Sequence, residues 1–139
     1  FIIALLGRKF GIFSICLYII LGWFLPVFAL GGGVKYIFEN GFGYILAFIP
    51  AAFFTGTLLK IKRDFLRILL MAVLGVLTIH ILGVLYMFFI AALKHSQMDL
   101  VLGWIITQSG IQILYDMFFT VIAIYLGRMS RKIFGIIMC

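Results

Sequence analysis

Long apolar runs alternate with short polar breaks along the whole chain. Residues 11–30 and 43–59 are two such runs, and the segment 31–42 between them carries one Lys and one Glu. A helix needs about 20 consecutive apolar residues to cross the hydrocarbon core of a bilayer. The pattern therefore predicts two membrane-spanning helices that are joined outside the bilayer.

The second half of the chain contains two longer apolar runs. Residues 66–93 exceed one straight span, so this helix is expected to tilt or to project beyond the hydrocarbon. A polar break follows at 94–99. The last run is interrupted by a group of polar or small residues, Thr107, Gln108, Ser109, Gly110 and Gln112. Because these residues could not face lipid as a group, we expect a surface or re-entrant segment at 100–112 and a spanning helix at 113–126.

The basic residues indicate the orientation of these spans. Nine of the eleven Lys and Arg residues form three clusters, which are Arg8 and Lys9, then Lys60, Lys62, Arg63 and Arg67, and finally Arg128, Arg131 and Lys132. Cytoplasmic loops of membrane proteins carry such an excess of Lys and Arg, so the order is in, out, in, out, in, with a cytoplasmic C-terminus. Residues 1–6 are interpreted as the end of an earlier spanning helix whose beginning is missing. The expected fold is an all-α membrane protein, a small polytopic helical bundle that forms one domain over 1–139.

Composition agrees with a membrane protein. The chain has 139 residues, of which 66% are hydrophobic and 11% charged, whereas a soluble domain carries about 25% charged residues. The formal net charge of +7 is attributed to topology and not to nucleic-acid binding. Cys16 and Cys139 have no disulfide or metal-ligand spacing, so no metal or cofactor is expected.

A proline and glycine-rich interruption at 22–48 separates the first two spans. It contains Pro26 and three consecutive glycines, which include Gly32 and Gly33. Backbone polar groups must be satisfied in lipid, so this segment is either a plain extramembrane turn or the mouth of a binding site. The basic groups on the predicted outer side are Lys35, Lys94 and His95, and one of them or His80 could supply the counter-charge for an anionic ligand.

Asp116 is the most informative single residue. An acid within a membrane segment costs about 2.5–3.5 kcal/mol on insertion scales, so it normally faces a partner or a wet cavity. Gln112 lies one helical turn earlier on the same helix face, and Tyr115 is adjacent in sequence. The three residues are candidate ligand contacts; the alternative is that Asp116 caps a helix or pairs within the bundle.

His80 lies in the middle of the run 66–93. A lone intramembrane His commonly makes one interhelical hydrogen bond, but His80 is kept as a candidate ligand contact. A proton relay would need a chain of titratable groups, for which the sequence offers Asp116. No enzyme pattern is found: Ser109 has no neighbouring His in the sequence, and both HExxH and P-loop motifs are absent. Five glycines spaced through the helices are interpreted as packing positions, Gly22, Gly56, Gly75, Gly83 and Gly127.

The interruption and its surroundings resemble a known family. LYIILGWFLPVFALGGG at 17–33 is similar to the glycine-rich segment of the BioY family, the biotin-binding S components of energy-coupling-factor transporters. The resemblance continues through GYILAFIPAAFFTGTL at 43–58, GVLTIHILGVLYMF at 75–88 and the acid Asp116. It implies a six-helix bundle in the plasma (inner) membrane. The first helix and most of the second would be missing here.

The resemblance also implies a function. Biotin would be captured from outside, beneath the loop after Pro26, and held in part by Asp116, with Tyr44 among the contacts. The ureido N–H groups of biotin could donate to an ionised carboxylate. Partners would be a transmembrane coupling protein and two ATPase subunits. The family usually has a Lys three residues after the acid, where this chain has Phe119, so Lys35 is the first candidate for a replacement cation.

Three other functions are weighed against biotin capture. The chain could be an S component or solitary carrier for another small vitamin. It could instead be a non-transporting membrane subunit in which Asp116 pairs with a partner helix. A proton-coupled carrier that uses Asp116 and His80 is the third.

Overall fold

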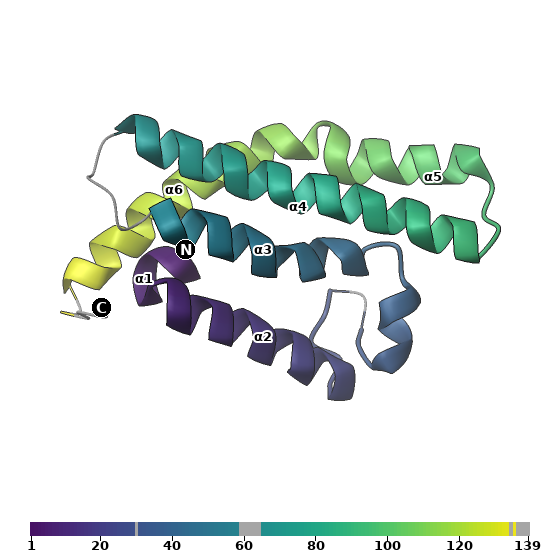
Figure 1. Cartoon of the computed structure of the whole chain (residues 1–139), viewed down its shortest axis with the longest axis horizontal. Coiled ribbons are helices and arrows are strands. Elements are labelled where there is room, and N and C mark those ends of the chain that lie inside the picture. Colours follow the sequence, from purple (N-terminus) through teal and green to yellow (C-terminus); the bar gives the residue numbers. More distant parts are fainter. Residues whose placement is uncertain (30, 59–64, 134, 136–139) are drawn as a thin grey trace.

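The computed structural model describes residues 1–29, 31–58, 65–133 and 135, and these residues form a bundle of helices (Figure 1). The elements in chain order are α1 (Ile2–Leu6), α2 (Arg8–Phe24), the 3-10 helix η1 (Val34–Phe38), α3 (Phe42–Leu58), α4 (Phe65–Leu93), α5 (Met98–Ile105), the π-helical turn η2 (Ile106–Gly110) and α6 (Gln112–Ile133). The predicted all-α class is confirmed, and the expected helices at 43–59 and 66–93 correspond to α3 and α4.

Helices α3 and α4 run side by side through the middle of the molecule, with α2 beyond α3 and α5 beyond α4, while α6 crosses α4 and reaches α1 (Figure 1). Their interface contains a reciprocal pair of contacts. The Tyr44 ring of α3 lies on Gly83 of α4, and the Tyr86 ring of α4 lies on Gly43 of α3. A methyl group at either glycine would collide with the opposing ring, so the small residues set the separation of the two helices.

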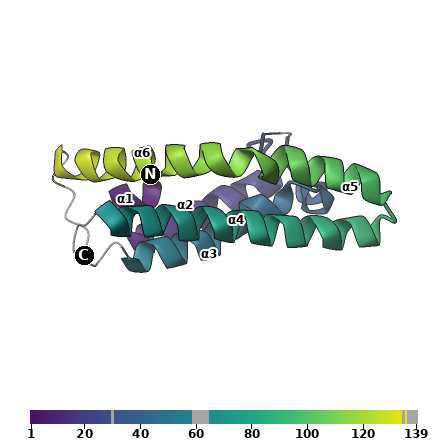
Figure 2. The ribbon, with the colours of Figure 1, turned by 90° about the horizontal axis from the view of Figure 1, so that it is seen from above.

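The prediction of a surface or re-entrant segment at 100–112 is wrong. Helices α5 and α6 follow one another through η2 as a single helical track of 36 residues, Met98–Ile133, alongside α4 (Figure 2). The polar residues stay in the helix because it satisfies them: the Thr107 hydroxyl donates to the carbonyls of Gly103 and Trp104 at 3.1 and 2.9 Å. Ser109 turns inward and is buried. Polarity in this run therefore indicated a local change of helix geometry.

The predicted span 11–30 also needs correction, because α2 begins at Arg8 and ends at Phe24. Leu25 is extended, with φ −122° and ψ 149°, as expected for a residue that precedes a proline. The chain then folds back on α2. Phe28 and Gly31 exchange two backbone hydrogen bonds of 2.8 and 2.9 Å, and the Gly33 N–H donates to the Gly22 carbonyl at 2.8 Å.

The segment after α2 is built around an aromatic cluster. Phe28 lies against Tyr36 and Phe42 with ring centroids 4.8 and 6.0 Å apart, and its ring covers Gly22. Phe42 in turn contacts Tyr86 of α4 at 6.1 Å. Through these rings much of the segment 31–42 is packed against α2 and α4.

The Tyr86 hydroxyl donates a hydrogen bond to the Ile37 carbonyl and ties η1 to α4. We expect Tyr86→Phe to lower the free energy of unfolding by about 0.5–1.5 kcal/mol, because the ring stays on Gly43 while one part-buried hydrogen bond is lost. Thermal unfolding in detergent measures the effect. Tyr125→Phe on α6, where the side chain is 47% exposed, is the control and should leave the melting temperature unchanged. Equal melting temperatures for the wild type and Tyr86→Phe would contradict the expectation.

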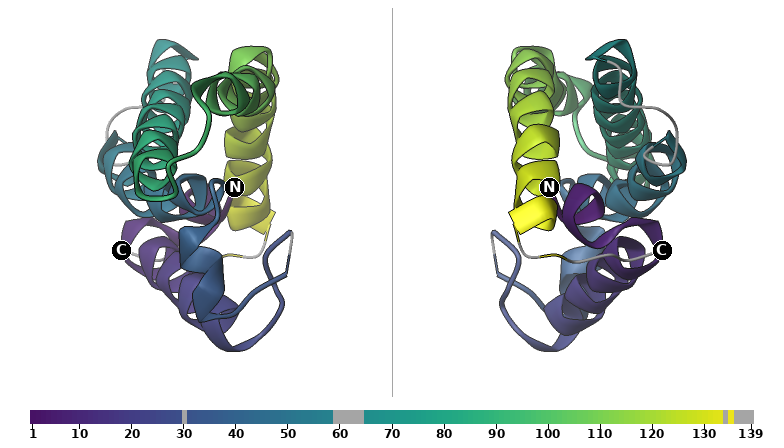
Figure 3. Two further views of the ribbon diagram at one scale, coloured as in Figure 1. Left: turned by 90° about the vertical axis from the view of Figure 1, so that its right-hand side faces the viewer. Right: turned by 90° about the vertical axis from the view of Figure 1, so that its left-hand side faces the viewer.

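All five glycines predicted as packing positions have a neighbour that a Cβ would strike. Gly56 faces the Arg8 side chain, Gly75 faces Thr55, and Gly127 faces Ala4 and the Phe1 carbonyl. Through Gly127, α1 bridges α6 to α2 at one end of the bundle (Figure 3). The prediction from small-residue spacing is confirmed at each position.

The outside of the bundle is apolar, and most of the described basic residues gather at one end. Large hydrophobic side chains are exposed on every long helix, including Phe13, Phe53, Leu85 and Phe118. Two helical tracks, Phe65–Leu93 and Met98–Ile133, are long and apolar enough to cross a membrane, and α3 is a shorter apolar helix. The starts of α2 and α4 and the end of α6, which carry Arg8, Arg67 and Lys132, lie at the same end (Figure 1). Lys60, Lys62 and Arg63 lie outside the described residues.

Candidate binding site

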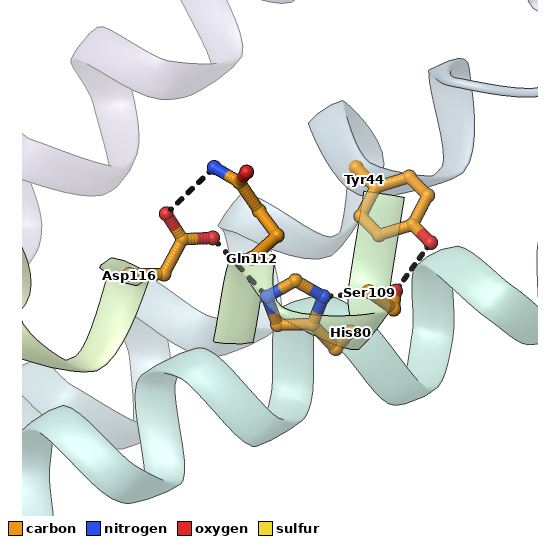
Figure 4. Close-up of polar contacts among 5 residues, drawn as sticks. All are labelled: Tyr44, His80, Ser109, Gln112 and Asp116. Carbon is orange, nitrogen blue, oxygen red and sulfur yellow. Dashed lines mark hydrogen bonds and ion pairs between the residues drawn. The ribbon is translucent and has the colours of Figure 1, made fainter. Parts of the chain in front are cut away.

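The candidate site is built from α3, α4 and the α5–α6 track. His80 lies in the middle of α4, and its side chain is 5% exposed. Both ring nitrogens are bonded: Nδ1 lies 2.9 Å from Ser109 Oγ, and Nε2 lies 3.1 Å from Asp116 Oδ2 (Figure 4). A buried polar group is stable when its hydrogen bonds are made, so the surroundings of His80 satisfy this requirement.

Ser109 is the site residue that sequence reasoning missed. The sequence shows no His near Ser109, but the fold places His80 in contact with it, 29 positions away along the chain. The π-helical turn η2 directs Ser109 inward and leaves it 6% exposed. Such turns insert an extra residue and often occur at functional sites. The signal in the sequence was the polar run in an apolar segment, which was assigned to a break in the helix.

Tyr44 extends the network toward α3. Its hydroxyl lies 2.6 Å from Ser109 Oγ, and its ring meets the His80 ring edge-on with centroids 5.8 Å apart. The ring is held because it lies on Gly83. Tyr44, a predicted site residue, thus belongs to the same constellation as His80 and Asp116, with its hydroxyl directed at Ser109.

Asp116 lies at the end of this network and is its acidic member. Its Oδ2 lies 3.1 Å from His80 Nε2, while its Oδ1 accepts from Gln112 Nε2 at 3.3 Å, as the i, i+4 spacing predicted. The Asp116 side chain is nevertheless 41% exposed, near the middle of the 36-residue track Met98–Ile133. One carboxylate oxygen faces the His80 ring and the other faces the Gln112 amide (Figure 4). A carboxylate offers about four lone-pair sites, so about two remain for another group.

The other predicted site residues lie outside this network. Tyr115 is 57% exposed on α6, and Lys35 is exposed on η1. Gly32 lies against the Leu25 and Gly22 carbonyls, and the Gly33 N–H is bonded to Gly22, so both have structural roles in the fold-back. Phe119, which stands where the family has Lys, is 61% exposed beside Phe118.

An apolar depression of about 380 Å³ lies elsewhere, between α3 and α4. Its lining is Gly43, Leu46, Ala47, Leu82, Leu85, Tyr86 and Phe89. The one hydroxyl in this lining, that of Tyr86, is already bonded to Ile37. We place the candidate site at Asp116, because polar groups converge there and the depression offers none that are free.

Known proteins share this fold. A crystal structure of the S-component for biotin from an ECF-type ABC transporter superposes on this chain with a TM-score of 0.73 and 21% identity, covering 93% of this chain and 69% of that one. A curated relative, the probable biotin transporter BioY of Lysinibacillus sphaericus, is 32% identical over 88 residues. These residues are 61% of this chain and 45% of the relative, so the chain matches less than half of that protein's length.

The fold is thus that of a helical membrane protein of the S-component type. The model of the BioY family matches residues 1–136, nearly the whole chain. The chain belongs to the BioY family.

Proposed function

We propose that this chain is the substrate-capture part of a biotin uptake transporter and that biotin binds at Asp116. The observation that carries the proposal is the half-exposed carboxylate in the middle of a membrane-length helix. An acid in a membrane segment costs about 2.5–3.5 kcal/mol on insertion scales, and the lone pairs that His80 and Gln112 leave free on Asp116 can accept from a donor on the ligand. The relative from Lysinibacillus sphaericus and the solved S component are both named for biotin, which supports this ligand.

The chemistry of Asp116 suits the ureido ring of biotin. A ureido N–H donates to the carboxylate, while Gln112, which already bonds Oδ1, lies next to the ligand and can orient toward its carbonyl. The apolar bicycle would pack against aromatic rings, for which exposed Tyr115 is the nearest in sequence. Asp116 and Gln112 are thus proposed as direct contacts.

The loop after Pro26 is proposed as the cover on the outer side. Lys35 is exposed on η1, at the end of the bundle opposite the cluster of Arg8 and Lys132 (Figure 1). Because Phe119 supplies no charge, we assign the biotin carboxylate to Lys35. Gly32 and Gly33 hold this loop against α2 and act on the ligand through its position.

The protein would reside in the plasma membrane as one domain with the basic end and the C-terminus in the cytoplasm. Capture alone moves nothing across the bilayer. We therefore propose that the chain acts with a transmembrane coupling protein and two ATPase subunits, and that it is not itself an enzyme.

The proposal is tested by isothermal titration of purified protein in detergent with biotin. We expect saturable one-to-one binding, and no binding of thiamine or riboflavin at the same concentrations. Circular dichroism establishes that the sample is folded. Saturable binding of another vitamin with none of biotin would reject biotin as the ligand, and folded protein that binds none of them would favour a membrane assembly subunit.

A further inference from the structure

We propose that Tyr44, Ser109 and His80 form a one-way hydrogen-bond chain that fixes Asp116 as an acceptor for N–H groups of the ligand. In this chain Ser109 and Tyr44 are positioning residues, which act on the ligand through His80 and Asp116. The inference rests on the proposed function where it concerns the ligand. The direction of the chain is a property of the protein without ligand and can be tested separately.

The direction follows from counting donors and acceptors. An ionised carboxylate accepts only, so His80 Nε2 carries a proton and donates to Asp116 Oδ2 across 3.1 Å. In a neutral imidazole the other nitrogen is then an acceptor, and the Ser109 hydroxyl donates to His80 Nδ1 across 2.9 Å. Ser109 has one proton to give, so the Tyr44 hydroxyl donates to Ser109 across 2.6 Å.

Burial of the hydrogen-bonded side chains maintains the direction of these hydrogen bonds. The side chains of His80 and Ser109 are 5% and 6% exposed, which leaves little access for water to offer other partners. Tyr44 lies on Gly83, so its ring has no room to retreat from Ser109. The titratable groups of other described elements that contact His80 are Tyr44 on α3 and Asp116 on α6.

The consequence concerns what the site recognises. His80 donates to one oxygen of Asp116 and Gln112 to the other, so both oxygens are held by donors and present their remaining lone pairs to the exposed side. A neutral ligand group with N–H donors, such as a ureido or amide group, fits there. A carboxylate of the ligand at this position would be repelled, because it and Asp116 are both acceptors without a proton to donate. The site therefore orients an N–H-bearing end of the ligand toward Asp116.

The chain is tested by nitrogen-15 NMR of histidine-labelled protein without ligand at neutral pH. The sequence has two histidines. Exposed His95 has φ 48°, a conformation that Asn tolerates, so His95→Asn leaves His80 as the single signal. We expect a protonated Nε2 and a bare Nδ1. Ser109→Ala should raise the population of the Nδ1–H tautomer, whereas Ser109→Thr, which keeps a hydroxyl, should not.

An Nδ1–H tautomer or an imidazolium in the wild type would overturn the chain, as would identical spectra for the wild type and Ser109→Ala. If Ser109→Thr does not fold, Tyr44→Phe is the second variant: it removes the donor to Ser109 and should shift the tautomer balance less than Ser109→Ala does.

Ligand binding gives the second readout. We expect Ser109→Ala to weaken biotin binding about 3- to 10-fold, the effect of one hydrogen bond acting indirectly, and Ser109→Thr to restore it. A biotin analogue methylated at both ureido nitrogens should bind both proteins with equal affinity, because it has no N–H for Asp116. Equal loss for biotin and the analogue would overturn the positioning role. If wild-type protein does not bind biotin, the proposed function fails, while the NMR result still decides the direction of the chain.

Discussion

Replacing Asp116 by Asn is expected to weaken biotin binding about 10- to 150-fold, which corresponds to loss of about 1.5–3 kcal/mol from a hydrogen bond to a charged group. The substitution keeps the size of the side chain and removes its charge. Asn can still accept from His80 through its oxygen, and Gln112 can rotate its amide to accept from the new NH₂ group. The internal network is thus retained, while the ligand loses its charged acceptor.

The matched control is Asp99→Asn. Asp99 is exposed in the first turn of α5 and carries the same charge outside the site. Titration calorimetry on the wild type and the two variants should show a loss for Asp116→Asn alone, with unchanged helix content. Similar losses in the two variants would indicate a general effect of charge and contradict a contact at Asp116.

The same variant separates capture from assembly. If Asp116 pairs with a helix of another subunit, Asp116→Asn should change the size of the purified particle and leave small-molecule binding as it was. Size-exclusion chromatography with light scattering measures this. We expect an unchanged particle, because the two oxygens of Asp116 already have partners on α4 and α6.

Replacing Gly32 by Ala is expected to destabilise the protein by about 1–3 kcal/mol, the usual cost of an overpacked site. A Cβ at this position would collide with the Leu25 carbonyl oxygen and come within 2.8 Å of the Gly22 carbonyl oxygen. These are backbone atoms at the end of α2, and they cannot turn aside as a side chain can. The fold-back would have to lift away, breaking the bond from Gly33 to Gly22.

The control for this change is Gly41→Ala, because a Cβ at Gly41 meets nothing within 4 Å. We expect a lower melting temperature for Gly32→Ala than for the wild type, and an unchanged melting temperature for Gly41→Ala. Stopped-flow measurement with a fluorescent biotin derivative should also show faster dissociation from Gly32→Ala if the loop covers the ligand. An unchanged dissociation rate, with a lowered melting temperature, would restrict Gly32 to a role in stability.

Much of the fold could be predicted because a helix that crosses a bilayer needs a long apolar run, which is easy to recognise in a sequence. Run length and basic clusters located α3 and α4 to within a residue or two, and small residues in the helices indicated close packing that Gly83 and Gly127 confirm. The end of α2 was misplaced because apolar character continues past Phe24, while the conformation is set by Pro26. Hydropathy indicates whether a segment lies in lipid or in water, but it does not indicate the residue at which the helix ends.

The site was predictable in part. Asp116 could be identified because an acid is rare in an apolar membrane segment. The helical repeat correctly predicted that Gln112 lies beside it. The link to His80 was one of the alternatives considered, as pairing within the bundle, and it is present. Ser109 was missed because its contact with His80 joins segments far apart in sequence through a π-helical turn, and no periodic pattern encodes such a turn.

The polar network also bears on how the protein is made. Its members come from α3, α4, η2 and α6, and the bond between Tyr44 and Ser109 spans 65 positions of the chain. Helices α3 and α4 are neighbours in sequence and can associate early, whereas Asp116 lies on α6, which leaves the ribosome after them. Until that helix docks, His80 is a buried imidazole that lacks its acid and its serine. Ligand binding should therefore appear only after α6 has docked on α4, so that a vitamin-binding assay on nascent chains would report this step of assembly in the membrane.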